Sequence, residues 1–399
     1  MKDRAQAPWP PVRRVENPQA LEEAIACWSQ APSLGVDTEA NSFHAYRERL
    51  CLLQVADGTD DWLVDPIALG GELRRIAPLF ANPAIPKIFH AAEYDLMLLR
   101  KELGIELRGL FDTQVASTLL KRKQTGLAAV LLEMYGLDVS KKEQRSDWGR
   151  RPLTPDQMAY ARSDVHFLPD LHLRLARDLE TEGVARHAAH EFARLEREVL
   201  IPRAPDPLRW RKMKGARALD PEGMARLEAL FQWRESLAEA RDVPPFRVLG
   251  NESIMELAAQ PPRDAKDLAS VGGVGWNLAR KIGPELMELL EAVKGRRVEI
   301  EAQPRLSSAE RKRQQIERDN LEALRMWRKD RAIALDLPSE RLLHRRQLED
   351  LARALPRTRE ELERILSLNE WQREYLEASL MGVLQSLPDP GSIAPPNSP

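Results

Sequence analysis

The sequence has few cysteines, no long apolar run and almost no net charge. Its 399 residues include two cysteines, Cys27 and Cys51, and no Cys-x-x-Cys pair. This argues against a thiolate zinc site and suits a reducing cytosol. No run reaches about 18 apolar residues, and the N-terminus has no apolar signal region, so we expect a cytoplasmic protein without membrane contact. The 60 basic and 62 acidic residues nearly cancel, but nucleic-acid binding stays open because it depends on where charges cluster.

The first half of the chain alternates between short apolar runs and helical periodicity. Strands are expected at residues 33–36, 50–56, 61–64 and 85–89. Helices are expected from residue 93 and at 112–120, 127–135 and 155–180. The Asp57-Gly58 pair between two of the strands predicts a hairpin. This order predicts an α/β domain with antiparallel and parallel strands.

The second half is predicted to be helical and contains an internal repeat. The segment LEALFQWR at 227–234 recurs as LEALRMWR at 321–328, an offset of 94 residues. Asp242, Pro244 and Leu249 recur at the same offset as Asp336, Pro338 and Leu343. A shared offset indicates a duplicated helical module. We therefore expect an α/β domain at 1–205, helical domains at 206–300 and 301–387, and a disordered tail at 388–399.

Four acidic residues and one tyrosine are candidates for a catalytic site. Asp37 and Glu39 are two apart on a strand, so their side chains leave the same face. Their carboxylates repel each other unless a cation lies between them. Asp95 lies at the start of a helix, and Tyr160 and Asp164 share a helix face. Each group alone also fits a plain structural role: a strand-end pair, an acid in a first helical turn, and a surface Tyr–acid pair.

Together these residues point to a metal-dependent phosphodiesterase. Mg²⁺ prefers carboxylate and water oxygens. Two such ions, ~4 Å apart, can activate a water molecule and stabilise the leaving 3′ oxygen. The predicted ligands are Asp37, Glu39, Asp95 and Asp164, and the expected cofactors are two divalent ions, Mg²⁺ or Mn²⁺.

The three acidic segments resemble the Exo I, Exo II and Exo III motifs of DEDD-type 3′–5′ exonucleases. The Tyr160-x-x-x-Asp164 spacing resembles the subclass with tyrosine in the third motif. The segment SDWGRRPLT at 146–154 resembles ribonuclease D, and the duplicated module resembles HRDC domains. The resemblance implies a ribonuclease H-like α/β exonuclease domain, a mixed sheet flanked by helices, followed by two all-α HRDC-like bundles.

The resemblance also implies an activity. The expected reaction is hydrolysis from a free RNA 3′ end, releasing nucleoside 5′-monophosphates, with tRNA precursors and other structured RNAs as substrates. Tyr160 would orient or deprotonate the attacking water. A monomer is favoured. The alternatives are a DNA-directed 3′–5′ exonuclease and a catalytically silent RNA-binding protein.

One segment departs from the ribonuclease D pattern. That pattern has a Phe and a nearby Arg directly after the first motif, whereas ANSFHAYR follows Glu39 here, at 40–47. This segment is closer to eukaryotic exosome-associated relatives, which leaves the substrate preference open. The second repeat also lacks the glycine-rich turn, VGGVG at 271–275, of the first.

The residues that contact nucleic acid are left open. The turn at 271–275 with Arg280 and Lys281 resembles a helix-hairpin-helix phosphate cradle, but a tight helix–helix turn fits equally well. The basic run at 209–217 fits RNA contact or a solvated helix start. His90 fits a structural role better than a metal or substrate contact. His187 and His190 are expected to form an exposed pair.

Overall fold

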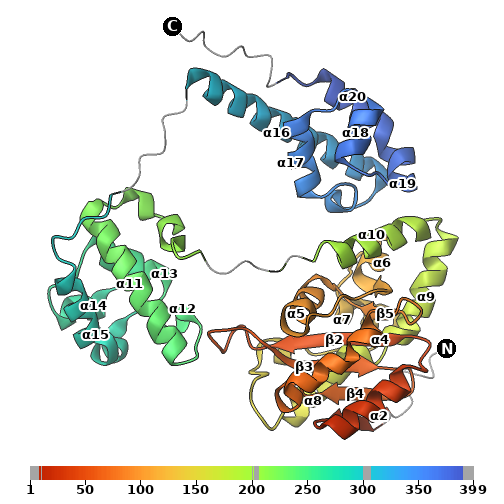
Figure 1. Ribbon diagram of the computed structural model, residues 1–399, viewed down its shortest axis with the longest axis horizontal. Helices are drawn as coiled ribbons and strands as arrows, with labels where there is room; N and C mark the ends of the chain where they lie inside the picture. The colour runs from red at the N-terminus through yellow and green to blue at the C-terminus, as the bar shows by residue number, and fades with distance from the viewer. Residues whose placement is uncertain (1–8, 10, 200, 202–205, 300–306, 390–399) are drawn as a thin grey trace.

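The structure is a computed structural model that describes residues 9, 11–199, 201, 206–299 and 307–389. Three large hydrophobic clusters form, and Figure 1 shows the corresponding α/β part and two helical parts. Each cluster draws its fully buried residues from one continuous stretch of the chain. The expected boundaries after residues 205 and 300, and the expected tail from residue 390 on, fall on segments outside the described residues.

The α/β part is built on one mixed sheet with the strand order β1-β4-β3-β2-β5-β6. β2 pairs antiparallel with β3 and parallel with β5, and β5 pairs parallel with β6. The expected mixture of antiparallel and parallel strands is therefore confirmed. The strands are β1 (Val12–Val15), β2 (Leu34–Ala40), β3 (Leu50–Ala56), β4 (Asp61–Val64), β5 (Lys87–Phe89) and β6 (Leu110–Asp112).

Helices flank this sheet. α8 packs against the central strands β2, β3 and β4, α9 packs against β2 and β5, and α5 packs against β3. The helices are α2 (Pro18–Trp28), α3 (Pro66–Leu69), η1 (Gly70–Ile76), α4 (Ala77–Phe80), α5 (Glu93–Leu103), α6 (Thr113–Leu119), α7 (Leu127–Tyr135), η2 (Lys142–Arg145), α8 (Pro155–Val165), α9 (Leu168–Thr181) and α10 (Ala185–Arg197).

The single helix expected over 155–180 is wrong, because the chain forms α8 and α9 with a corner between them. Pro169 lies in the first turn of α9. Proline has no backbone N–H and cannot continue the helical hydrogen bonds of α8. The corner rests on β2 at Gly35, where an added Cβ would lie 2.8 Å from Leu168 Cβ and 2.9 Å from the carbonyl oxygen of Val165. Glycine is therefore required for α8 to approach β2 this closely.

The rest of the described chain is helical. The first module contains η3 (Arg209–Lys212), η4 (Ala216–Ala218), α11 (Pro221–Ala240), α12 (Pro245–Val248), α13 (Asn251–Ala259), α14 (Ala265–Ser270) and α15 (Gly275–Ala292). The second contains α16 (Ser308–Leu335), η5 (Ser339–Arg341), α17 (Arg345–Ala354), α18 (Arg359–Ile365), α19 (Glu370–Gln372), the π-helix η6 (Arg373–Glu377) and α20 (Ala378–Ser386).

The two modules share an internal hydrogen bond at the repeat offset. The guanidinium of Arg234 donates to the carbonyl of Leu249 at 3.1 Å. Its counterpart Arg328 donates to the carbonyl of Leu343 at 2.6 Å. In both modules this bond ties the first long helix to the end of the turn that follows it, so the sequence repeat is also a structural repeat.

Within the described part of the chain, no helix combines the length and the apolar character that crossing a membrane requires.

Candidate active site

Asp37 and Glu39 lie on β2, inside the sheet between β3 and β5. They are two residues apart, so both carboxylates leave the same face of the strand. The pairing register with β3 shifts between Glu39 and Ala40, where β2 ends. The two acids therefore lie near the end of a fixed strand, and an irregular loop follows them.

Tyr160 and Asp164 lie on α8, which packs directly on β2. The helix begins at a capping box, in which Thr154 accepts from the backbone N–H of Gln157 and Gln157 accepts in return. This defined start, together with the close approach at Gly35, sets the rotation of the helix face that carries Asp164.

The structure brings three of the predicted acids together. Carboxylate oxygens of Asp37, Glu39 and Asp164 all lie within 4.8 Å of one another. This acid triplet joins residues that are more than 120 positions apart in the chain. Among the described residues, the set that meets this distance does not include Asp95.

Asp95 lies beside the triplet but is held by another residue. It is buried in the first turn of α5, and the hydroxyl of Thr38 donates to its carboxylate at 2.5 Å. Its burial, and then the negative charge of Asp37, raise the pKa of Asp95 well above its usual range. Thr38 was missed by the sequence reasoning, because strand alternation places its side chain away from Asp37 and Glu39.

The triplet is electrostatically strained without a cation. Burial, and then the nearby Asp164, raise the pKa of Asp37 well above its usual range. Burial, and then Asp37, raise the pKa of Glu39 to about 10. Burial also raises the pKa of Asp164 to about 7, although a hydrogen bond from Tyr160 opposes the shift. Like charges in a desolvated site disfavour ionisation of each other.

These residues fit a divalent cation. The donors are oxygens only, which Mg²⁺ and Mn²⁺ accept, and no thiolate or imidazole is among them. A bound cation would offset both the burial and the repulsion that raise the pKa values of these acids. The cluster is thus compatible with divalent-metal binding, and its donor set does not distinguish Mg²⁺ from Mn²⁺.

The hydroxyl of Tyr160 faces the same acids. The ring centroid of Tyr160 lies 6.0 Å from that of the buried Trp148, and both rings belong to a small hydrophobic cluster that includes Ala161. Burial, and then Asp164, raise the pKa of Tyr160 well above its usual range. The phenol therefore keeps its proton at neutral pH in this arrangement.

Known proteins share both parts of this architecture. Residues 12–180 match a family described as 3′–5′ exonuclease, and residues 224–290 and 317–384 each match the HRDC domain. A ribonuclease D of Pseudomonas paraeruginosa is 31% identical over 385 residues, covering 94% of this chain and 98% of its own length. The chain belongs to the ribonuclease D family. A ribonuclease D of Acidiphilium cryptum is 33% identical over 70% of this chain and 71% of its own length.

A solved structure supports the same assignment. The crystal structure of Escherichia coli RNase D, described as an exoribonuclease involved in structured RNA processing, has a TM-score of 0.64 and 26% identity. It covers 95% of this chain and 100% of its own. The chain is thus a ribonuclease D-type hydrolytic exoribonuclease, with its 3′–5′ exonuclease domain at the N-terminal side of two HRDC domains.

Two segments that the sequence offered as RNA contacts, 271–275 and 209–217, make contacts within their own helical module. In the turn at 271–275, the backbone N–H of Gly272 donates to Glu256 at 3.2 Å, and its carbonyl accepts from Ser253 at 2.6 Å. In the basic run at 209–217, Trp210 is buried in the module core. The structure therefore favours the tight helix–helix turn and a largely structural role for the start of the basic run.

The remaining histidine candidate near the site, His90, is anchored by Thr113. Nδ1 of His90 lies 2.9 Å from the hydroxyl of Thr113, which itself donates to the carbonyl of Phe89. The Thr113 hydrogen is thus used, so Nδ1–H of His90 is the donor to Thr113. Burial lowers the pKa of His90 to about 4, which keeps the ring neutral.

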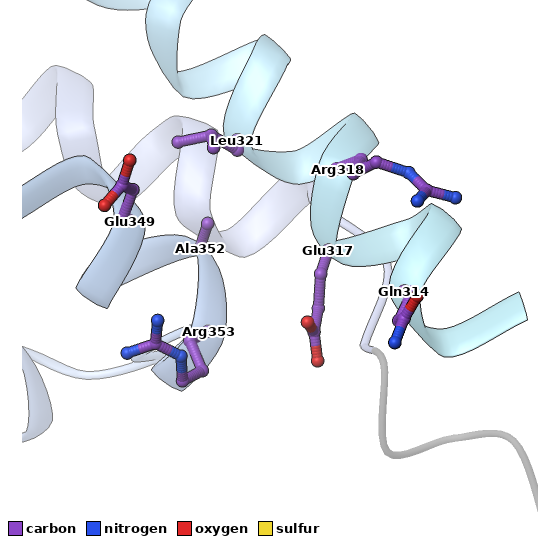
Figure 2. A pocket seen from close by; sticks show the side chains of 7 residues that line it. All are labelled: Gln314, Glu317, Arg318, Leu321, Glu349, Ala352 and Arg353. Carbon is purple, nitrogen blue, oxygen red and sulfur yellow. The ribbon is translucent and has the colours of Figure 1, made fainter. Parts of the chain in front are cut away.

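A separate groove of about 300 Å³ lies between α16 and α17 of the second HRDC domain. Figure 2 shows that acidic and basic side chains alternate around it. It contains none of the five predicted site residues, and its mixed charge offers no cluster of one sign. Its lining residues are Gln314, Glu317, Arg318, Leu321, Glu349, Ala352 and Arg353.

Proposed function

We propose that this protein trims the 3′ ends of structured RNAs such as tRNA precursors and releases nucleoside 5′-monophosphates. The observation that carries the proposal is the convergence of the Asp37, Glu39 and Asp164 carboxylates within 4.8 Å, with Asp95 and Tyr160 beside them. A phosphodiester is anionic, and so is the transition state of its hydrolysis. Four clustered carboxylates, of which Asp95 is buried and the others are partly buried, would repel it unless cations were also present.

We propose that Asp37, Glu39, Asp95 and Asp164 hold two divalent ions. When bound, such ions supply Lewis-acid activation of water and charge stabilisation on the phosphate oxygens. The chain contributes rigidity: β2 fixes two of the acids, and α5 and α8 each contribute one. Thr38 holds Asp95 at the edge of the cluster through its 2.5 Å hydrogen bond.

Tyr160 is proposed to orient the attacking water. Its raised pKa means that it is a poor proton acceptor at neutral pH. Of the two roles expected from the sequence, orientation is therefore favoured over deprotonation. A protonated phenol both donates and accepts a hydrogen bond, so it can fix a water molecule against the phosphate.

The loop after Glu39 offers a surface for the RNA 3′ end. Phe43 is half exposed, and the guanidinium of Arg145 lies 5.9 Å from the centre of its ring. An exposed aromatic ring beside a cation suits a stacked base and its phosphate. This supports a single-stranded 3′ end as the part of the RNA that enters the site.

The direct test is the product ladder from a tRNA precursor carrying a 5′ label. We expect stepwise shortening from the 3′ end in Mg²⁺ or Mn²⁺ and none with chelator. Asp95→Ala should abolish shortening. Equal activity of this variant and the wild type would contradict the proposed site.

Parallel reactions separate the alternatives. Faster degradation of a DNA strand of matched sequence would favour a DNA-directed enzyme. Binding of the RNA without any degradation in either metal would favour a silent RNA-binding protein. The expectations of a cytoplasmic monomer stay predictions.

A further inference from the structure

The loop of residues 41–48 connects two of the elements that carry the predicted acids. It continues directly from β2, beyond Glu39. At its other end the Glu48 carboxylate accepts from the hydroxyl of Tyr94, the neighbour of Asp95 on α5. The carbonyl of Glu48 also accepts from the amine of Lys101 on the same helix, at 2.9 Å. The loop therefore ties β2 to α5.

The same loop reaches the segment that leads into α8. Nε2 of His44 lies 3.0 Å from the carbonyl of Arg145. The residues just after Arg145 are bound to α8, because the Gln157 amide donates to the hydroxyl of Ser146 at 2.6 Å and to the carbonyl of Asp147 at 3.2 Å. Each of the three elements that carry predicted acids is thus linked to loop 41–48.

The first HRDC domain holds the middle of this loop. Arg247 lies 3.1 Å from Nδ1 of His44, and Asp242 accepts from the backbone N–H of Tyr46 at 3.1 Å. A guanidinium only donates, so Nδ1 of His44 accepts and its Nε2–H is left to bind the carbonyl of Arg145. The hydroxyl of Tyr46 also donates to Glu235 at 3.2 Å. His44 therefore joins Arg247 of the HRDC domain to Arg145, in the segment that precedes α8.

The contact also has an apolar part. The ring of Tyr46 packs against the hydrophobic cluster of the first HRDC domain, although Tyr46 belongs to the exonuclease domain. On the rim, Arg47 and Glu239 form an ion pair at 2.6 Å. The first HRDC domain thus contacts the loop at three positions near its centre, His44, Tyr46 and Arg47.

The second HRDC domain uses the equivalent turn on a different surface. Asp336, the counterpart of Asp242, lies 3.9 Å from Lys121, and Arg341, the counterpart of Arg247, lies 3.8 Å from Glu191 on α10. Both aspartates adopt a positive φ, 45° and 52°. The same turn therefore faces the exonuclease domain in both copies, but only the first copy grips loop 41–48 in these contacts.

The second contact has its own aromatic anchor. Trp371 stacks on His187 of α10 with ring centroids 4.2 Å apart, and Asn369 lies 3.3 Å from Nδ1 of His187. His187 is buried, so the expectation of an exposed pair with His190 is wrong for His187. No sequence pattern near His187 indicates Trp371 as its partner.

We infer that the first HRDC domain is a positioning element of the active site. By clasping loop 41–48 through Asp242 and Arg247, it fixes the spacing of β2, α5 and α8, and hence of the acids they carry. This inference rests on the proposed function of that site. A positioning role differs from a role in RNA binding, because it affects the hydrolysis of a substrate that is too short to reach the HRDC domain.

The test compares equivalent substitutions in the two copies. Arg247→Glu and Arg341→Glu each place an acid at the docking turn, where the arginine contacts His44 in the first copy and Glu191 in the second. The substrate is the shortest single-stranded RNA that the wild type hydrolyses. We expect Arg247→Glu to lower kcat roughly tenfold or more with little change in KM, because small displacements of catalytic groups are costly. Arg341→Glu should leave both constants near the wild-type values.

Two further variants guard against misfolding. Tyr46→Ala removes the ring that packs on the HRDC domain and the hydroxyl that donates to Glu235, but keeps the backbone N–H that donates to Asp242. It should lower kcat in the same direction as Arg247→Glu, by a smaller factor. Arg247→Lys keeps a donor for His44 and should recover most of the activity. Thermal unfolding of each variant reports whether the chain is folded at the assay temperature.

The outcomes separate this inference from the proposed function. Unchanged kcat on the short RNA in Arg247→Glu and Tyr46→Ala overturns the inference, and a rise in KM on long RNA alone would assign the domain to binding instead. An equal loss in Arg341→Glu also overturns it. Full activity of Asp95→Ala would instead show that the proposed site itself is wrong.

Discussion

Buried carboxylates occur in two settings in this protein. Glu39 lies among three other acids, and burial together with Asp37 raises its pKa to about 10. Glu191 on α10 is also desolvated, but hydrogen bonding from His344 and the charge of Arg194 outweigh burial and lower its pKa. Glu191 has counter-charges beside it, whereas among the described residues burial and the other acids raise the pKa of Glu39 and no positive charge offsets them. The difference indicates which buried acid is structural and which one is arranged for a ligand.

The largest expected effect comes from Glu39→Gln. Because the Glu39 carboxyl is protonated at neutral pH without a cation, glutamine replaces it with a neutral group of the same shape. In chelator we expect the free energy of unfolding to stay the same or rise. Hydrolysis of a 3′-extended RNA should fall roughly 10³-fold or more, as for loss of a central catalytic group. Near-normal turnover would remove Glu39 from the site.

Glu191→Gln should give the opposite pattern. It removes the buried negative charge that faces Arg194, Arg341 and His344, although Arg194 keeps its pair with Glu198. Breaking a buried ion pair in this way costs about 3 kcal/mol. Urea unfolding measures this loss. Activity at low temperature should match the wild type. A large loss of activity with unchanged stability would contradict the structural role of Glu191.

The pH dependence of stability should differ between the wild type and Glu39→Gln. Glu39 has a raised pKa in the folded state, so its contribution is present below the unfolded pKa and is lost as pH rises towards about 10. In chelator, wild type should therefore lose stability relative to Glu39→Gln by about 1 kcal/mol per pH unit between pH 5 and 8. Taking the difference cancels His90 and His187, whose lowered pKa values act in the other direction.

A saturating divalent ion should abolish that slope. The ion supplies the missing positive charge, so the ionised carboxylates become the stable form. Thermal unfolding at several pH values, with Mn²⁺ or with chelator, reports the effect. A slope that is the same with and without Mn²⁺ would mean that the acids do not bind it.

The smallest expected effect is that of an exposed carboxylate. Glu349 pairs with Arg345 at 2.7 Å one turn away on α17, in solvent. Exposed pairs of this kind contribute little. Glu349→Gln should leave both the unfolding midpoint and the hydrolysis rate within measurement error. A clear loss of activity would indicate that the second HRDC domain contributes to catalysis.

Periodicity within one element was predictable from the sequence. Strand alternation placed Asp37 and Glu39 on one face, and helix spacing placed Tyr160 beside Asp164. The repeat offset predicted two similar modules, and the equivalent hydrogen bonds of Arg234 and Arg328 occur at the same offset. Such features need only residues that are close in the chain.

Features that depend on two elements meeting were not predictable in this way. The corner at Pro169 and the contact at Gly35 bring α8 onto β2 only in the folded chain. Thr38 reaches Asp95 from the face that alternation assigns away from the site. The contacts on loop 41–48 join residues far apart in the chain, such as His44 and Arg247, which are 203 positions apart, and no local sequence pattern indicates them.

The most direct test of the account is calorimetric titration of the chelator-treated protein with Mn²⁺ at pH 7, in two buffers of different ionisation enthalpy. Because the pKa of Glu39 is about 10 and that of Asp164 is about 7, binding should release protons. We expect tight binding with a buffer-dependent heat in wild type and in Glu191→Gln, and much weaker binding in Glu39→Gln. Equal binding by wild type and Glu39→Gln, with no proton release, would contradict it.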